Sequence, residues 1–137
     1  MPGVEQASAP ALTGAEPHLF VADVTASCKF FSDVLGFRVV FTYGTPPFFA
    51  QVARDSARLN LRHVDRAPID NGMREDETLL AASLTVASAA DIEALCEELW
   101  RRGAQFFQPL RTEPWGARTF IVRDPDGNLL HFAGPAA

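Results

Sequence analysis

The sequence lacks the features that mark several common classes of protein. Its apolar runs are all much shorter than the roughly 20 residues of a membrane-spanning helix. No Gly-x-Ser-x-Gly elbow is present, and no glycine-rich phosphate-binding loop follows a predicted strand. The sequence therefore does not predict a membrane protein, a hydrolase with a serine nucleophile elbow or a nucleotide-binding protein with a phosphate loop.

Positive charge is scarce as well. Lys and Arg number 12 against 17 Asp and Glu, which gives a net charge of −5 at pH 7. Nucleic acid is bound by basic surfaces, so the balance disfavours it and mildly favours cationic ligands. The 137 residues are 47% hydrophobic and 21% charged, as expected for one globular domain.

Cysteine is also rare, and the two cysteines do not form a CxxC pair. Cys28 and Cys96 each fall on the apolar face of a predicted helix, so we expect buried free thiols and a reducing compartment, the cytoplasm. Residues 1–15 are rich in Ala, Pro and Gly and lack the basic start and apolar run of a secretion signal. They are predicted to form a flexible tail that precedes a single domain at 16–137.

Hydrophobic periodicity predicts the order β-α-β-β-β twice, in modules at about 17–63 and 80–133. The first module has predicted strands at 17–22, 37–43, 48–53 and 57–63, with a helix that Asp23 or Thr25 caps and Gly36 ends. The second has strands at 80–87, 105–108, 118–123 and 129–132, with a helix that Ser88 caps and Gly103 ends. Residues 64–79 are polar and are predicted to be a connecting loop. The predicted fold class is α+β, with curled mixed sheets around a shared cleft.

The last two strands form a predicted hairpin. Asp124-Pro125-Asp126-Gly127 has the residue types of a tight turn, because Asp caps the backbone, Pro fixes φ and Gly tolerates positive φ. Trp115, flanked by Pro114 and Gly116, stands at the mouth of this hairpin. It is a candidate ring for stacking on a ligand, and the alternative interpretation is that it covers an edge of the core.

Several of these motifs resemble the vicinal-oxygen-chelate superfamily, which includes glyoxalase I, extradiol dioxygenases and bleomycin-resistance proteins. The resemblance rests on Val21-Ala22-Asp23-Val24, Phe30-Phe31, Leu35-Gly36-Phe37 and Arg123-Asp124-Pro125-Asp126-Gly127-Asn128. Within the superfamily, the segments around Pro114-Trp115-Gly116 and Phe49–Asp55 are most similar to the bleomycin-binding proteins. The resemblance is specific for the fold and not for an activity.

The glyoxalase-type metal-ligand positions fall, by this resemblance, on Glu16, Asn60, Ala81 and His131. Ala81 has no ligand atom, and the Asn60 amide is a weak donor for Zn or Ni. The incomplete set implies no metal cofactor and no catalytic residue, and it favours a binding protein over an enzyme. His18 shares the strand parity of Glu16, so a divalent metal held by His131, His18 and Glu16 is the alternative. The protein would then be a metal-dependent lyase, isomerase or dioxygenase.

The same resemblance implies a groove between two subunits, in which aromatic rings stack on a flat ligand. The stacking positions carried over are Phe49 and Trp115, and the implied ligand-binding set is Phe49, Trp115, Phe41, Tyr43, Asn60 and His131. Pro17 matches the proline after which bleomycin-resistance proteins exchange a strand, so a swapped homodimer is implied. The bleomycin binders have acidic residues in the segment corresponding to 40–47, and this chain has none there. We therefore expect a small-molecule ligand, aromatic or cationic, that is flatter and less charged than bleomycin.

Overall fold

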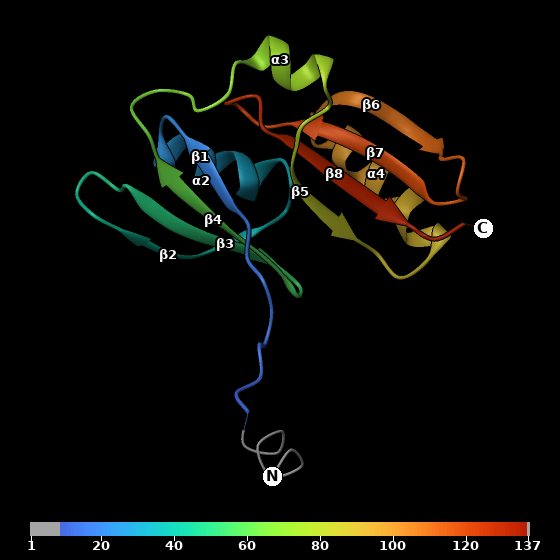
Figure 1. Cartoon of the computed structure of the whole chain (residues 1–137), viewed down its shortest axis with the longest axis horizontal. Coiled ribbons are helices and arrows are strands. Elements are labelled where there is room, and N and C mark those ends of the chain that lie inside the picture. Colours follow the sequence, from blue (N-terminus) through green and yellow to red (C-terminus); the bar gives the residue numbers. More distant parts are fainter. Residues whose placement is uncertain (1–8, 137) are drawn as a thin grey trace.

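The computed structural model describes residues 9–136, which form two βαβββ modules (Figure 1). The first contains β1 (His18–Val21), α2 (Val24–Asp33), β2 (Arg38–Tyr43), β3 (Phe49–Arg54) and β4 (Ala57–His63). The second contains β5 (Leu80–Thr85), α4 (Ala89–Arg101), β6 (Gln105–Thr112), β7 (Arg118–Arg123) and β8 (Leu129–Gly134). Most of the predicted tail, residues 1–8, lies outside the described residues, and residues 9–16 contain no helix or strand.

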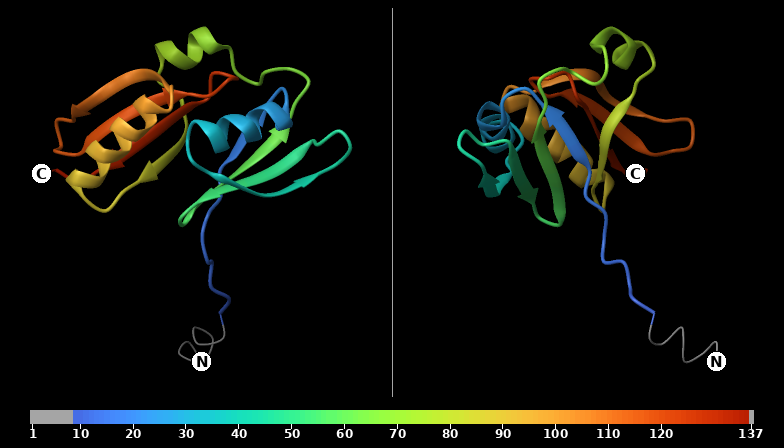
Figure 2. Two further views of the ribbon diagram at one scale, coloured as in Figure 1. Left: turned by 180° about the vertical axis from the view of Figure 1, so that it is seen from behind. Right: turned by 60° about the vertical axis from the view of Figure 1, so that its left-hand side comes forward.

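Each module has one four-stranded mixed sheet, in the orders β1-β4-β3-β2 and β5-β8-β7-β6. The pairs β1–β4 and β5–β8 are parallel, and the remaining pairs are antiparallel. Helices α2 and α4 lie behind the sheets in Figure 1 and in front of them from the opposite side in Figure 2. Both sheets are therefore covered by a helix on the same side and open on the other, which confirms the predicted fold class.

Helices α2 and α4 begin at residues that the sequence predicts as caps. The side chains of Asp23 and Ser88 each accept a hydrogen bond, at 3.0 Å, from the backbone N–H three residues ahead. Gly36 and Gly103 follow the helices with φ of +71° and +88°, a region that glycine enters without a steric penalty. Neither helix is long and apolar enough to cross a membrane, and the same holds for the short helix between them.

A single hydrophobic core joins the modules, because the apolar faces of both helices and both sheets meet in it. Phe31, Leu61, Ile92 and Phe120 are fully buried members of this core. Cys28 is buried in the core and Cys96 is half-buried against it, so burial raises the pKa of both thiols. Both free thiols lie on the apolar helix faces, as the sequence predicts.

The predicted loop at 64–79 contains a short helix, α3 (Asn71–Asp76), so this part of the prediction is wrong. The Asp70 side chain caps the helix by accepting a backbone N–H at 3.1 Å. The buried Arg74 side chain donates to the backbone carbonyl of Asp126 at 3.2 Å. The helix is stabilised by this contact with a segment far along the chain, which local sequence patterns do not reveal.

Strand β6 also departs from prediction, since it extends to Thr112 rather than ending at Gln108. Pro109 lies inside it, where the strand is at the edge of its sheet and the pairing with β7 is irregular between Gln108 and Arg111. An edge strand with a bulge tolerates the missing N–H of proline.

The turn between β7 and β8 connects the second module to β1. Asp124 Oδ1 accepts the backbone N–H groups of Asp126 (2.9 Å) and Asn128 (2.8 Å), and its Oδ2 accepts Asn128 Nδ2 (2.8 Å). Asn128 Nδ2 also donates to the carbonyl of Phe20 at 3.2 Å, and Asp126 Oδ1 accepts the N–H of Ala22 at 2.8 Å. The predicted turn is therefore present and also forms part of the contact between the modules.

The pKa of Asp124 makes this turn sensitive to pH. The side chain is buried, and burial raises the pKa of its carboxyl to about 6, although the three N–H donors act in the opposite direction. A raised pKa means that the folded state binds the proton more tightly than the unfolded state does. This stabilisation is complete below the unfolded-state pKa of about 4 and is lost as the pH rises through about 6.

We predict that Asp124→Asn flattens the pH dependence of stability between about pH 4 and 7. The wild-type free energy of unfolding contains a term, on the order of 3 kcal/mol, that decreases as the pH rises over this range. The variant lacks this term, whatever the substitution does to the absolute stability. Urea unfolding of both proteins at several pH values measures the two slopes. Equal slopes would show that Asp124 does not titrate in this range.

Candidate functional site

The open face of the first sheet carries exposed aromatic side chains. The Phe41 and Phe49 rings are stacked, with centroids 6.0 Å apart and planes 25° apart, and Tyr43 meets Phe48 edge to face at 5.4 Å. Phe41 and Tyr43 lie on the edge strand β2, where they are 44% and 66% exposed. Apolar rings gathered at a surface in this way mark a site for a ligand or a partner.

A polar cluster lies beside these rings at the centre of the same sheet. Asn60 is buried, and its Nδ2 contacts His18 Nε2 at 3.3 Å and donates to Glu16 Oε1 at 3.2 Å. Gln51 Nε2 donates to Asn60 Oδ1 (3.1 Å) and Glu16 Oε1 (3.0 Å). The His18 ring lies 5.9 Å from the Phe49 ring, so the polar and aromatic clusters are continuous. Gln51 was not predicted from the sequence, although it shares the strand parity of Phe49.

The open face of the second sheet has its own polar cluster, built around a buried carboxylate. Glu113 is 8% exposed, and its Oε1 accepts Thr119 Oγ1 (2.8 Å) and Arg111 Nε (2.7 Å). Gln108 Nε2 donates to Thr119 Oγ1 at 3.0 Å. Hydrogen bonds from Arg111 and then from Thr119 lower the pKa of Glu113. These residues were not predicted from the sequence; the one local signal was a charged residue directly before the Pro-Trp-Gly segment.

His131 lies on the same face and pairs with a hydroxyl. Its Nδ1 is 3.0 Å from Ser83 Oγ. Burial lowers the pKa of His131, outweighing the nearby Glu113 carboxylate, so the imidazole is neutral at pH 7. A neutral imidazole hydrogen-bonded to a hydroxyl leaves one donor and two acceptor lone pairs for neighbouring groups.

Trp115 lies at the tip of the β6–β7 connection, in a turn that is held by backbone hydrogen bonds. The Glu113 N–H donates to the carbonyl of Ala117 at 2.7 Å, and the Gly116 N–H donates to the carbonyl of Glu113 at 2.9 Å. Gly116 has φ of +99°, which the turn requires and which favours glycine. The Trp115 side chain is 74% exposed, so it does not cover an edge of the core.

The predicted ligand-binding residues fall into two groups within one chain. Phe41, Tyr43, Phe49 and Asn60 belong to the first sheet, whereas His131 and Trp115 belong to the second. Among the described residues, no ring contact joins Phe49 and Trp115. The two proposed stacking rings therefore come from different modules.

Strand register shows which side chains lie opposite one another on the two open sheet faces. In the parallel pair β1–β4, Asn60 lies opposite His18, and in the equivalent pair β5–β8, His131 lies opposite Ser83. Glu16, one of the expected ligand positions, also reaches this cluster, because its Oε1 accepts Asn60 Nδ2 at 3.2 Å.

Two of these four positions carry weak metal ligands. Asn60 and Ser83 offer neutral oxygens, which are weak ligands for Zn or Ni. Over residues 9–136, no three His, Cys, Asp or Glu side chains lie close enough together to hold a metal ion. Glu16 and His18 of the alternative trio lie beside Asn60 of the first module and His131 lies in the second, so these three do not come together within one chain.

Comparisons with known proteins agree with this architecture. Solved structures include a bleomycin-binding protein from bleomycin-producing Streptomyces verticillus in complex with copper(II)-bleomycin. It is 29% identical, with a TM-score of 0.67, and the match covers 94% of this chain and 99% of that one. A bleomycin resistance determinant encoded on the transposon Tn5 shares the fold at 19% identity and a TM-score of 0.68, over 92% of this chain and 100% of the other. A glyoxalase/bleomycin resistance protein/dioxygenase from Alicyclobacillus acidocaldarius also shares the fold. It is 20% identical, with a TM-score of 0.69, and the match covers 89% of this chain and 92% of that one.

A search of curated proteins finds no match. Residues 12–132 match the family described as the Glyoxalase/Bleomycin resistance protein/Dioxygenase superfamily. This match spans both modules and both polar clusters, and it agrees with the resemblance found in the sequence motifs. The chain therefore belongs to the glyoxalase/bleomycin resistance protein/dioxygenase superfamily.

Proposed function

We propose that this protein is a small-molecule binding protein of the bleomycin-resistance type, which sequesters a drug or an aromatic metabolite without a metal. The observation that carries the proposal is the stacked pair of exposed Phe41 and half-buried Phe49, which lies on the open sheet face beside hydrogen-bonding side chains. A planar ligand laid on such rings gains apolar burial and about 0.5–1.5 kcal/mol for each offset stack. The likeness to a bleomycin-binding protein supports the same function.

The charges near the rings favour a flat ligand with little charge. Glu16 and Glu113, the carboxylates closest to the two polar clusters, already accept hydrogen bonds from neighbouring side chains. In the acidic run 75–77, Glu75 is paired with Arg123 at 2.6 Å. A ligand with several positive charges would therefore find few free carboxylates, whereas a flat heteroaromatic needs only the rings and a few hydrogen-bonding groups.

The complete site requires a second copy of the chain. Because Phe49 and Trp115 lie in different modules, a homodimer that places the second module of one protomer against the first module of the other would bring them together. Residues 9–16 extend away from the body of the protein before Pro17 (Figure 1), a geometry compatible with exchange of this arm between protomers. The two free thiols pack in or against the core, and unpaired cysteines are typical of a reducing compartment such as the cytoplasm.

We predict that Trp115→Ala and Phe49→Ala each weaken ligand binding, by roughly two- to tenfold for the loss of one stack. Calorimetric titration with metal-free bleomycin and with uncharged acridine measures the effect. Trp100→Ala is the matched control, because Trp100 is a similarly exposed tryptophan on α4. Urea unfolding should show little change, since both ring positions are partly or largely exposed. Affinities equal to wild type in both variants would rule out the stacking mode.

We also predict that the purified protein binds no stoichiometric Zn, Ni, Mn or Fe(II), since the donors at the family's ligand positions are weak. Metal analysis after dialysis against each ion, together with the thermal unfolding midpoint, tests this. One equivalent of tightly held metal that His131→Ala removes would contradict the proposal. That result would favour the metal-dependent lyase, isomerase or dioxygenase instead.

A further inference from the structure

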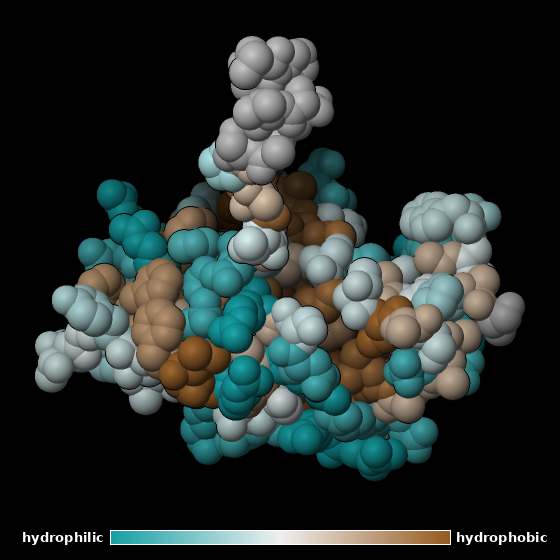
Figure 3. Space-filling model, turned by 90° about the horizontal axis from the view of Figure 1, so that it is seen from below, coloured by the Kyte–Doolittle hydropathy of each residue, from teal (hydrophilic) through white to brown (hydrophobic). Residues whose placement is uncertain are grey.

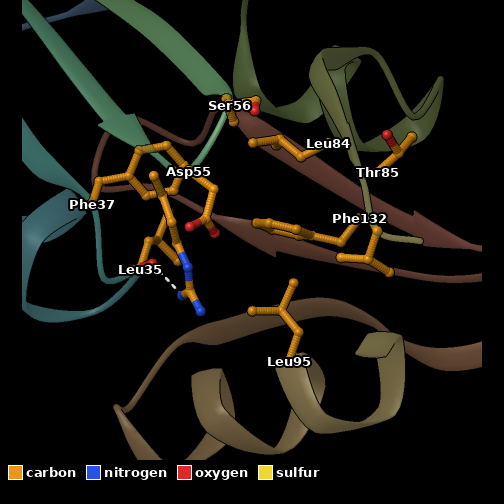
Figure 4. A pocket seen from close by; sticks show the side chains of 11 residues that line it. Leu35, Phe37, Asp55, Ser56, Leu84, Thr85, Leu95 and Phe132 are labelled. Carbon is orange, nitrogen blue, oxygen red and sulfur yellow. Dashed lines mark hydrogen bonds between the residues drawn. The ribbon is translucent and has the colours of Figure 1, made fainter. Parts of the chain in front are cut away.

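A separate pocket of about 260 Å³ lies between the two modules, away from the aromatic face of the first sheet. One wall comes from the first module, at Leu35, Phe37 and the β3–β4 turn, and the other from Leu84, Leu95 and Phe132 of the second module (Figure 4). The β3–β4 turn and the end of β5 lie at the lower side of the molecule in Figure 1. Seen from that side, apolar residues reach the surface between polar ones (Figure 3).

The inner walls of this pocket are apolar and are held rigidly. Leu35, Phe37 and Phe132 are buried members of the core, so their positions are fixed by packing. Leu84 and Leu95 are only partly buried and turn their remaining surface toward the pocket. An apolar group of the right size would remove this surface from water, at about 25 cal/mol per Å². The volume lies below the roughly 300–1,000 Å³ of sites for drug-sized molecules, so the pocket suits a smaller ligand.

The mouth of the pocket is acidic. The Arg54 guanidinium is already paired. It makes a bidentate contact with Glu98 (2.7 and 2.9 Å) and donates to the carbonyl of Leu35 (2.9 Å). Asp55, at φ of +50° in the β3–β4 turn, directs its carboxylate into the pocket (Figure 4). Within residues 9–136 this carboxylate has no hydrogen-bond or ion-pair partner. A groove that continues from the mouth adds the Asp91 carboxylate.

We propose that this pocket binds a compact amphipathic cation, a short aryl or alkyl group that carries one ammonium. The apolar part would occupy the space between Leu84, Leu95 and Phe132, and the ammonium would pair with the Asp55 carboxylate at the mouth. An ammonium has three donors and no acceptor, which matches a carboxylate whose oxygens are free. This site goes beyond the proposed function, because none of its residues belongs to the stacking site.

The matched probes are phenethylammonium and its uncharged analogue 2-phenylethanol, followed by two-dimensional NMR of the backbone amides. We expect phenethylammonium to shift the resonances of Leu84, Leu95 and Phe132, and 2-phenylethanol to bind more weakly. Asp55→Asn should weaken phenethylammonium binding by roughly two- to fivefold, as for a solvent-accessible ion pair. Asparagine tolerates positive φ, so the turn is retained. Asp76→Asn, which removes an equally exposed carboxylate from α3, is the control and should change nothing.

Two further variants separate this site from the stacking groove. Thr85→Trp places a large ring in the pocket from an exposed position of β5, and should abolish binding of the probe without unfolding the protein. Trp115→Ala should leave it unchanged. The proposal is overturned if the shifts occur at Phe41 and Phe49 instead, if Asp55→Asn has no effect, or if the two probes bind equally well. None of these results would test the stacking proposal, which is tested separately by the calorimetric titrations of the Trp115 and Phe49 variants.

Discussion

The turn Asp124–Asn128 is a polar contact that links the end of β1, helix α3 and the second sheet. Its buried aspartate orders the turn by accepting three N–H groups, and the ordered turn then bonds to Phe20 and Ala22 at β1 and to Arg74 of α3. Burying a carboxylate is unfavourable unless donors surround it, so the turn must be complete to be stable. The end of β1, the connecting helix and the second sheet are thereby held in one arrangement.

This arrangement explains why the candidate site is divided. The helices occupy one side of both sheets, so the open faces are left with the polar pairs that strand register creates, His18–Asn60 and Ser83–His131. These pairs occupy equivalent places in the two modules, as an internal duplication implies. Their amide and hydroxyl groups make poor metal ligands but good hydrogen-bonding partners for a neutral ligand. The Phe49 ring beside His18 would supply apolar contact for such a ligand.

Local patterns in the sequence predicted the elements that local interactions determine. The helix caps Asp23 and Ser88, the hairpin turn and the order of the strands follow from short-range chemistry and periodicity, and the structure confirms them. Helix α3 was missed because Arg74 secures it to a distant turn. The Glu113 cluster was missed because its members, Gln108, Glu113 and Thr119, converge only when β6 and β7 pair.

We propose that the ligand lies between Phe49 of one protomer and Trp115 of the other. The most direct test is to mix Phe49→Ala and Trp115→Ala proteins, after dissociation and reassembly, and to titrate the mixture with acridine by calorimetry. In a heterodimer of the two variants, one site lacks both rings and the other keeps both. We expect binding at wild-type affinity to return in the mixture, at one site per heterodimer. If the mixture binds no better than the separate variants, the two rings do not form a composite site between subunits, and the claim is wrong.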